Sequence, residues 1–210
     1  WAYQDNMINT IHNNRFTIAK LPRQSGKSTT VIAYLLHYVL FNSEVNVAIL
    51  ANKQATAREL LYRLKLAYEN LPKWLQQGII EWNKGNISLE NNSKVLASST
   101  SSSAVRGGSF NMIFLDEFAY VPENVADEFF SSVYPTISSG KETKVLIIST
   151  PKGLNMYYKL WRDAEEGNNS YVPIEVHWSE VPGRDDKWKK ETIANTSRSQ
   201  FRAEFECEFI

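Results

Sequence analysis

A Gly-Lys-Ser-Thr run at 26–29 stands between an apolar segment at 16–21 and a longer apolar stretch, and it could bind phosphate groups. Backbone N–H groups at the start of a helix are unpaired and bind phosphate oxygens. A lysine at position 27 can reach the outer phosphates of a nucleoside triphosphate, and the Ser28 hydroxyl can ligate Mg²⁺. Leu21 stands where the usual phosphate-binding loop has its first glycine. Taken alone, the run is explained equally well as a helix start that carries a lysine.

An acidic pair strengthens the phosphate interpretation. Asp116 and Glu117 directly follow the apolar segment 112–115, which is typical of a strand buried on both faces. In a mostly parallel α/β sheet, ligands bind at the carboxyl ends of the strands. Asp116 can hold Mg²⁺ opposite Ser28, and Glu117 can polarise the water that attacks a phosphoryl group. The pair alone could merely cap the next helix, but together with the Gly-Lys-Ser-Thr run it predicts an ATP-type nucleotide site.

The segments that must position these residues alternate between short apolar runs and longer helical patterns. Besides 16–21 and 112–115, strands are predicted at 45–51 and 145–148, and a hairpin at 87–97 around an Asn-rich turn. Helices are predicted at 27–41, 56–69, 124–133 and 156–166, the first of them apolar on every face and therefore buried. This alternation predicts an α/β fold, a mostly parallel sheet flanked by helices, with a small hairpin or helical annex.

The composition is that of an ordinary globular protein. Hydrophobic residues make up 43% and charged residues 22%, and the formal net charge is zero, which argues against disorder and gives no direct sign of nucleic-acid binding. No apolar run reaches the ~18 residues of a membrane span, and the start lacks the layout of a signal peptide. With Cys207 as its one cysteine, the chain can form no internal disulfide. We expect a soluble, intracellular protein and, because residue 1 is Trp, a piece of a longer one.

Other chemistry-bearing side chains favour structural roles. The three histidines lie far apart and have no Cys or carboxylate at metal-ligand spacing, which argues against a metal site: His12, His37 and His177. Cys207 lies between two glutamates, a setting that raises a thiol pKa and disfavours a nucleophile. Three tryptophans could stack on bases, but packing in the core is the interpretation we favour: Trp82, Trp161 and Trp188.

At four places the sequence resembles the large terminase subunits of tailed bacteriophages. The segment Leu-Pro-Arg-Gln-Ser-Gly-Lys-Ser-Thr at 21–29 is similar to the deviant phosphate loop of that family, in which an arginine replaces part of the glycine-rich stretch. Three further segments match in order, at 82–85, 104–107 and 148–155. The resemblance runs from residue 3 to residue 209 and is strongest to the T-even type. It implies a P-loop NTPase fold of the RecA/ASCE class, with residues 1–210 as the N-terminal ATPase domain and the family's nuclease domain absent from this chain.

The resemblance also implies a fuller nucleotide site. Tyr3 and Gln4 match the family's adenine-recognition motif, and a glutamine amide offers both a donor and an acceptor to the N6/N7 edge of adenine. Outside the resemblance, an exposed glutamine near a chain end is the simpler explanation. The implied nucleotide-binding residues are Tyr3, Gln4, Arg23, Gln24, Ser25, Gly26, Lys27, Ser28 and Thr29, and the implied metal ligands are Ser28 and Asp116.

Five residues have catalytic roles in what the resemblance implies: Glu117, Arg106, Arg23, Lys27 and Thr150. Arg23 would lie against the γ-phosphate, and Arg106 would act as an arginine finger from a neighbouring subunit. Whether each arginine acts within its own subunit or across subunits stays open. Arg106 could instead order the serine-rich loop before it. Thr150 would sense the γ-phosphate, or alternatively its hydroxyl caps the turn that follows.

The implied function is hydrolysis of ATP, with Mg²⁺, to drive double-stranded viral DNA into a procapsid. The implied partners are the viral DNA, the portal protein, the small terminase subunit and further copies of the chain in a ring, without a membrane. The implied location is the cytoplasm of the infected bacterium, on the procapsid and not in the mature virion. Two alternatives stay open. An ATP-dependent helicase shares the glutamine motif and the Asp-Glu pair but needs a second RecA-like domain, and a non-catalytic module would bind nucleotide only to dock on the portal.

Overall fold

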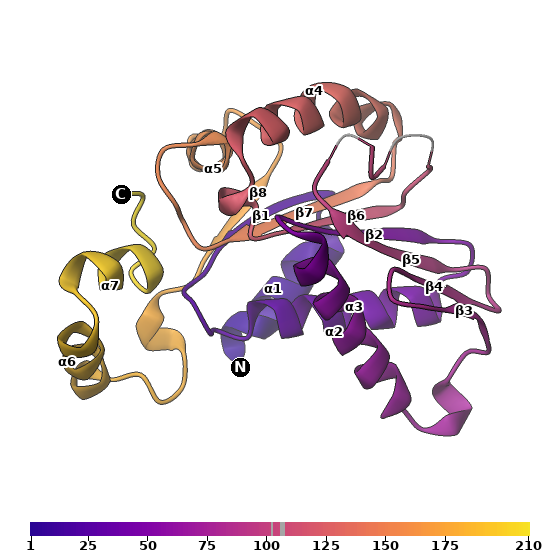
Figure 1. Ribbon diagram of the computed structural model, residues 1–210, viewed down its shortest axis with the longest axis horizontal. Coiled ribbons are helices and arrows are strands. Elements are labelled where there is room, and N and C mark those ends of the chain that lie inside the picture. Colours follow the sequence, from indigo (N-terminus) through magenta and orange to yellow (C-terminus); the bar gives the residue numbers. More distant parts are fainter. Residues whose placement is uncertain (102, 106–107) are drawn as a thin grey trace.

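The computed structural model describes residues 1–101, 103–105 and 108–210, and its centre is an eight-stranded sheet. The strand order is β3-β4-β5-β2-β6-β7-β1-β8 (Figure 1). All neighbours from β5 to β8 are parallel, whereas β4 pairs antiparallel with both β3 and β5. The strands are β1 (Phe16–Lys20), β2 (Asn46–Ala51), β3 (Ile79–Trp82), β4 (Asn86–Leu89), β5 (Lys94–Ser99), β6 (Met112–Asp116), β7 (Lys144–Ser149) and β8 (Val172–Glu175). The predicted α/β fold and the predicted hairpin are confirmed.

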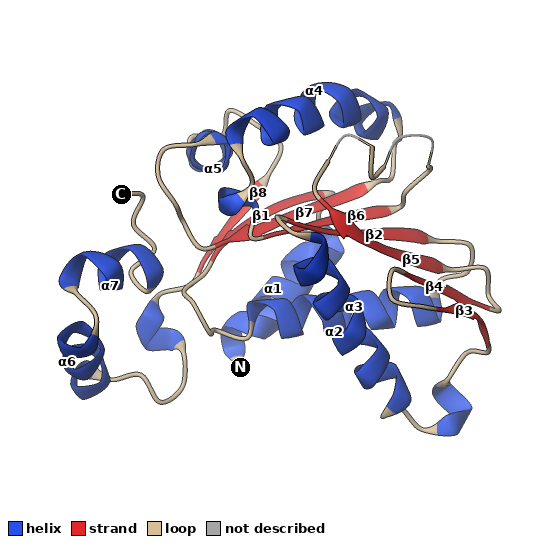
Figure 2. Cartoon of the chain, in the orientation of Figure 1, coloured by secondary structure: helices blue, strands red, loops and turns tan. Residues whose placement is uncertain are grey.

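Helices cover both faces of the sheet, as Figure 2 shows. One face carries α1, α2 and α3, and the other carries α4 and α5. The last two helices, α6 and α7, lie beyond the β8 edge (Figure 1). The α-helices are α1 (Ala2–Asn13), α2 (Lys27–Phe41), α3 (Gln54–Glu69), α4 (Glu123–Ser139), α5 (Met156–Glu165), α6 (Asp186–Asn195) and α7 (Arg198–Glu204). The short 3-10 helices are η1 (Lys73–Leu75), η2 (Phe118–Tyr120) and η3 (Trp178–Glu180). Within the described ranges, no helix combines the length and apolarity needed to cross a bilayer.

Alternate residues of each central strand enter different cores. In β6, Met112 and Phe114 pack with α2 and α3, whereas Ile113 and Leu115 pack with α4 and α5. Successive side chains of a strand point to opposite faces of its sheet. A continuous apolar run in a parallel strand therefore fills both cores at once. The same reasoning explains α2, in which nine of 15 residues are buried because it lies between the sheet and two other helices.

Several elements differ from the sequence prediction. The helix predicted to end at 133 continues to Ser139, past Pro135, and Ile137 packs into the core with 4% exposure. Proline normally ends a helix by removing a donor, but here burial of the next apolar turn outweighs that cost. The sequence prediction also lacked α1, β3, β8, α6 and α7. Their signals are weak: β8 contains Pro173 at the sheet edge, and α6 has no fully buried residue.

Candidate active site

The loop at 21–26 joins the end of β1 to the start of α2. Gln24 and Gly26 adopt left-handed φ angles of 54° and 73°, and α2 begins at Lys27. This geometry is easy for glycine, whereas at Gln24 it costs on the order of 1 kcal/mol. The loop turns sharply as a result, and it ends in a helix start whose first N–H groups have no partner inside the helix. Such a turn is suited to an anion.

Three predicted site residues from distant parts of the sequence meet beside this loop. Lys27 Nζ lies 2.8 Å from Glu117 Oε1 and donates a 3.0 Å hydrogen bond to Thr150 Oγ1. The three residues follow β1, β6 and β7, which are neighbours in the order β6-β7-β1. Because parallel strands end at the same edge of a sheet, the topology brings an ammonium, a carboxylate and a hydroxyl to one point.

Ser149 lies beside the second oxygen of the same carboxylate. Its hydroxyl lies 3.5 Å from Glu117 Oε2, donates a 2.8 Å bond to the Thr150 carbonyl, accepts a 3.1 Å bond from the Ala119 N–H and is fully buried. Glu117 itself has a left-handed φ of 49°, a strained geometry for a non-glycine residue. Strain of this kind persists only where neighbouring contacts impose it. The 2.8 Å ion pair with Lys27 is such a contact, and it holds Glu117 Oε1 in a defined position.

Asp116 is the buried member of the acidic pair. It is 3% exposed, and its Oδ1 atom has no hydrogen-bond partner among the described residues. Burial, with a smaller contribution from Glu117, raises the pKa of this carboxyl to about 7. A buried oxygen without a partner is costly and is well suited to a cation. One carboxylate and one hydroxyl are a usual protein share of a Mg²⁺ site, in which phosphates and waters supply the rest. Asp116 and Ser28 therefore fit the predicted Mg²⁺.

Comparison with known proteins decides the family. A family model described as terminase large subunit, T4likevirus-type, N-terminal, matches residues 18–210. The match includes the phosphate loop, the acidic pair and Thr150. The chain belongs to this family. The resemblance drawn from the sequence is thereby confirmed.

Two curated relatives are the terminase large subunits of Thermus phage G20c and Thermus virus P23-45. Each is 32% identical over 121 residues, which cover 50% of this chain and 24% of the relative. The aligned region is thus about a quarter of each relative's length. The activities of the whole relatives therefore belong to a much longer sequence than the part aligned with this chain.

Solved large-terminase structures share the fold. A variant of the ATPase domain from Thermus phage P74-26 superposes with a TM-score of 0.76 at 21% identity, covering 99% of this chain and 93% of that one. The large terminase of bacteriophage HK97 gives 0.80 at 18% identity, covering 99% and 50%. The large terminase of a thermophilic bacteriophage, solved in complex with ATP-γ-S, gives 0.74 at 11% identity, covering 99% and 52%. At these identities the likeness establishes the terminase ATPase fold.

The two residues of the predicted adenine motif reach the phosphate loop from α1. The Tyr3 hydroxyl donates a hydrogen bond to the Ser25 carbonyl, and Gln4 Nε2 donates to Thr30 Oγ1 at 2.8 Å. A Cβ added to Gly26 would lie 3.0 Å from Gln4 Nε2, so glycine lets α1 approach closely. Both motif residues thus lie beside the loop, with the Gln4 amide nitrogen engaged by α2. That Gln4 recognises adenine stays a prediction.

Arg23 points toward the C-terminal helices. Its guanidinium lies 3.4 Å from Glu204 Oε1, and its side chain is 54% exposed. Its backbone N–H also donates to the Glu204 carbonyl at 2.9 Å. Arg23 still lines the cavity beside the phosphate loop. Its contact with a γ-phosphate stays a prediction that requires the guanidinium to exchange Glu204 for phosphate.

The cavity beside the loop contains one residue that the sequence prediction missed. It has a volume of about 220 Å³ and is lined by residues 23–29, Glu117 and Arg63. Arg63 comes from α3, is half exposed, and lies 3.4 Å from Glu59 Oε1. No motif surrounds it, and on a helical pattern it resembles any solvent-facing arginine. Only the packing of α3 against the sheet brings its charge to the cavity.

The predicted finger Arg106 lies outside the described residues. Its neighbour Val105 is buried in the core that holds α4 and α5. The role predicted for Arg106 therefore stays a prediction.

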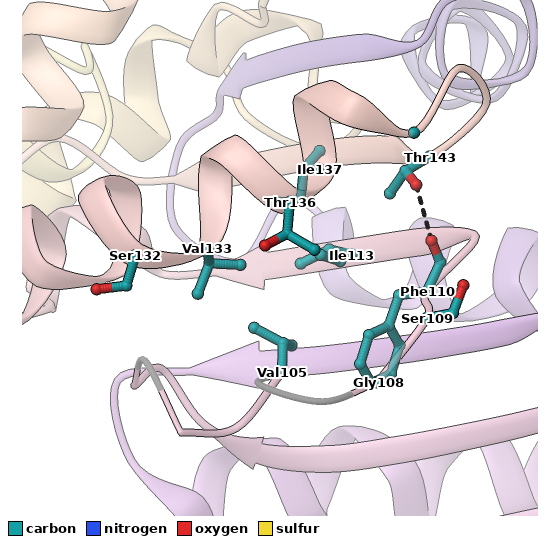
Figure 3. Close-up of a pocket in the computed structure, with 11 residues that line it drawn as sticks. Val105, Gly108, Ser109, Phe110, Ile113, Ser132, Val133, Thr136, Ile137 and Thr143 are labelled. Carbon is teal, nitrogen blue, oxygen red and sulfur yellow. Dashed lines mark hydrogen bonds between the residues drawn. The ribbon is translucent and has the colours of Figure 1, made fainter.

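A larger cavity lies at the other end of the strands. It measures about 400 Å³ and is lined by residues of α4 and of the segments that precede β6 and β7, among them Val133, Phe110 and Thr143 (Figure 3). Thr143 Oγ1 donates to the Phe110 carbonyl at 2.8 Å (Figure 3). The phosphate loop follows the carboxyl end of β1, whereas this cavity adjoins the amino ends of its neighbours. None of the described residues that line it carries a charged side chain.

The remaining chemistry-bearing residues have structural contacts. His37 packs on Phe41, and the ring of His177 caps η3. Burial raises the pKa of the Cys207 thiol to about 12, and the adjacent glutamates are not among the causes of the shift. Trp161 is 2% exposed in the core, and the other two tryptophans pack against neighbouring rings: Trp82 on Tyr68, and Trp188 on Trp178, Phe201 and Phe205. Among the described residues, no group of three possible metal ligands occurs.

Proposed function

We propose that this chain binds ATP with Mg²⁺ and hydrolyses it, and that in the complete terminase this hydrolysis drives double-stranded viral DNA into a procapsid. The observation that carries the proposal is the contact of Lys27 with Glu117 and Thr150 beside the phosphate loop. ATP hydrolysis is a property of the terminase family, and the solved relative in complex with ATP-γ-S supports an adenine nucleotide as the ligand. A protein catalyses phosphoryl transfer mainly by positioning the reactants and by electrostatic stabilisation of the transition state.

Lys27 exchanges partners when the nucleotide binds. In the free chain its ammonium neutralises Glu117. A triphosphate carries more negative charge than one carboxylate, so it competes for the same ammonium. Glu117 Oε1 is then released to orient a water and accept its proton, while Oε2 stays beside the Ser149 hydroxyl. The base becomes available only when phosphates occupy the loop.

Ser28 and Asp116 would hold Mg²⁺ at the same strand edge. The cation supplies charge neutralisation of the transferring phosphoryl group. Asp116 must lose its proton to act as a ligand, and with a pKa of about 7 it can do so near neutral pH. Thr150 links the γ-phosphate to the chain that follows β7, because its hydroxyl also donates to the Leu21 carbonyl at 3.3 Å. Binding or loss of phosphate at Lys27 can thereby shift two loops, the phosphate loop at Leu21 and the segment that follows Thr150.

The site is completed by two arginines and by partners. Arg23 would stabilise the γ-phosphate within its own subunit, and Arg106 would come from a neighbouring copy in a ring. The ring would stand on the portal protein of a procapsid, with the small terminase subunit and double-stranded DNA as further partners. The reaction would take place in the cytoplasm of the infected bacterium, before the virion matures.

Two alternatives make different predictions. A helicase would separate strands, whereas a packaging motor moves a duplex intact, so a strand-separation assay distinguishes them. A non-catalytic assembly module would bind ATP without turnover. It would therefore be insensitive to loss of the Glu117 carboxylate.

The decisive experiment compares wild type with Glu117→Gln in MgATP binding and in phosphate release. The variant keeps the shape of the side chain but cannot accept a proton. We expect it to bind MgATP at least as tightly, because Lys27 no longer has a competing carboxylate, and to lose turnover by about 10²–10⁴-fold. The matched control is Glu123→Gln, an exposed carboxylate at the start of α4. Equal turnover in the Glu117 variant and wild type would contradict the proposed base.

A further inference from the structure

The last helices of the chain have a small core of their own. Trp178, Phe201 and Phe205 are buried together, and Trp188 and Ile193 pack against them. We call residues 177–206, which include η3, α6 and α7, the C-terminal helical segment. It lies beyond the β8 edge, next to the phosphate loop (Figure 1). A contact between this segment and the phosphate loop couples the position of the segment to the position of the loop.

Arg184 connects the two. Its Nη2 atom donates hydrogen bonds to the Arg23 carbonyl at 2.7 Å and the Gln24 carbonyl at 3.1 Å. Its guanidinium lies 4.7 Å from the centre of the Trp188 ring and 5.3 Å from that of Phe205. A planar guanidinium can stack on rings and donate in its own plane at the same time. The small core therefore orients Arg184 toward the loop backbone.

The two carbonyls that Arg184 binds belong to the two peptide groups on either side of the Gln24 Cα. The left-handed backbone of Gln24, with a φ of 54°, sets the angle between these two peptide planes. A non-glycine residue enters this region at a cost on the order of 1 kcal/mol, so the loop needs an outside contact to favour it. Hydrogen bonds from a charged donor are about twice as strong as neutral ones. Arg184 is such a contact.

Holding these carbonyls also directs the opposite side of the loop. In a trans peptide the C=O and the N–H point in opposite directions. The carbonyls of residues 23, 24 and 25 are all held from outside, the first two by Arg184 and the third by the Tyr3 hydroxyl. The N–H groups of residues 24 and 25 therefore face away from Arg184, and neither donates a hydrogen bond within the described part of the chain. Consecutive free N–H groups form a cradle for phosphate.

We propose that Arg184 is a positioning residue for ATP binding: from the C-terminal helical segment it holds the Arg23 and Gln24 carbonyls, so that the loop N–H groups are aimed at phosphate. The inference rests on the proposed nucleotide site and adds a residue to it. It also predicts coupling, because a contact that favours the bound loop must itself be strengthened when phosphate occupies that loop. Nucleotide should therefore stabilise α6 and α7.

The main alternative is that Arg184 only attaches the C-terminal helical segment to the domain. That role is shared by the Arg23–Glu204 ion pair and by the bond from the Arg23 N–H to the Glu204 carbonyl. Under this alternative, loss of Arg184 lowers the unfolding free energy but leaves the nucleotide affinity of the folded chain unchanged. Affinity and stability therefore separate the two roles.

The test measures MgADP affinity by calorimetry and amide hydrogen exchange of α6 and α7 with and without MgADP. We expect Arg184→Gln to bind MgADP roughly tenfold more weakly, the equivalent of about 1.4 kcal/mol. Arg184→Lys should recover part of the affinity, because an ammonium can donate to both carbonyls without the stacking. In wild type, MgADP should slow exchange in both helices, and in Arg184→Gln it should not.

Two further variants sharpen the comparison. Tyr3→Phe frees the third carbonyl and leaves both Arg184 hydrogen bonds to the loop in place, so it should weaken MgADP binding while the helices still respond to nucleotide. Arg198→Gln, at an exposed position of α7, should change neither. Thermal unfolding identifies any variant that fails to fold, and in that event the Lys variant carries the test.

Either of two results would overturn the inference alone: a folded Arg184→Gln that binds MgADP as wild type does, or an Arg198→Gln that is equally weakened. If wild type itself does not bind MgADP, the proposed nucleotide site is wrong and the inference falls with it. Wild-type binding thus distinguishes the two failures.

Discussion

At the scale of single residues, the adjacent carboxylates of Asp116 and Glu117 have different surroundings and are therefore suited to different roles. Asp116 is buried with an oxygen that lacks a partner, and its pKa is raised to about 7. Glu117 lies at the cavity, with one oxygen on Lys27 and the other near Ser149. The first is suited to a cation and the second to a water. The pair is one motif in the sequence but two environments in the fold.

Asp116→Asn tests the buried carboxyl through the pH dependence of stability. Its pKa is 3.8 in a model compound and about 7 in the folded chain, so between these values the folded state binds the proton more tightly. The wild-type free energy of unfolding should therefore fall as pH rises from about 4 to about 7 and stay low above that. Asparagine stays neutral, so the variant should nearly equal wild type near pH 4 and exceed it by on the order of 4 kcal/mol near pH 8.

Urea unfolding at several pH values measures this difference. Asp127→Asn, an exposed carboxylate in α4, serves as the control and should follow wild type at every pH. Parallel pH curves for wild type and Asp116→Asn would contradict the raised pKa.

Arg63 should contribute to nucleotide affinity although no motif contains it. It shares the cavity with Glu117 and the phosphate loop, and its contact with Glu59 is long and exposed, so phosphate can displace that partner. We expect Arg63→Gln to raise the MgATP dissociation constant by roughly tenfold. Arg58→Gln removes the same charge from an exposed position of the same helix and should have little effect. Equal weakening in both would indicate a general charge effect, not a contact.

At the scale of elements, two basic side chains cap helices on opposite faces of the sheet. Arg15, after α1, donates to the carbonyls of Ile137, Gly140 and Thr143 around the end of α4. Lys144, after α4, donates to the carbonyls of three residues at the end of α1: Ile11, His12 and Asn14. The last carbonyls of a helix have no partner within it, and cations there are favourable. Arg15, which follows α1, thus caps the end of α4, and Lys144, which follows α4, caps the end of α1.

Arg15→Lys should destabilise the fold without changing the site. A lysine keeps the charge but cannot span three carbonyls with a planar fork, so we expect a loss of about 1–3 kcal/mol in the free energy of unfolding. Arg162→Lys, an exposed residue paired with Glu166, should cost well under about 1 kcal/mol. Since Arg15 lies at the end of the sheet away from Lys27, the turnover of folded Arg15→Lys should match wild type. A change in turnover at unchanged stability would contradict this division.

At the scale of the whole molecule, the site lies at the carboxyl ends of the parallel strands, and Arg106 is the finger predicted for it. If Arg106 acts across subunits, specific ATPase activity should rise with protein concentration, and Arg106→Ala should lose about 10³-fold or more. A mixture of Glu117→Gln and Arg106→Ala should regain part of the activity, because one subunit supplies the base and its neighbour supplies the finger. Wild-type activity that does not change with concentration, together with an inactive mixture, would assign Arg106 to its own subunit.

The sequence by itself determined the elements of the centre and the chemistry of the loop. Buried parallel strands are apolar throughout, and functional residues such as Lys27 and Glu117 lie in the segments that follow them. Both the apolar runs and these residues are local features of the sequence. Local signals can be interpreted without knowing where the chain goes next. The edge strand β8 and the helix α6 lack them and were missed.

Only the tertiary structure decided which side chains meet. The order β6-β7-β1 brings Lys27, Glu117 and Thr150 together, and no spacing along the chain encodes that order. Arg63 and Arg184 resemble ordinary surface arginines in the sequence, because their significance lies in contacts with residues far away along the chain. The raised pKa of Asp116 depends on burial beneath other segments. Desolvation, long-range pairing and strand order arise from the packing of distant segments, and a local pattern cannot carry them.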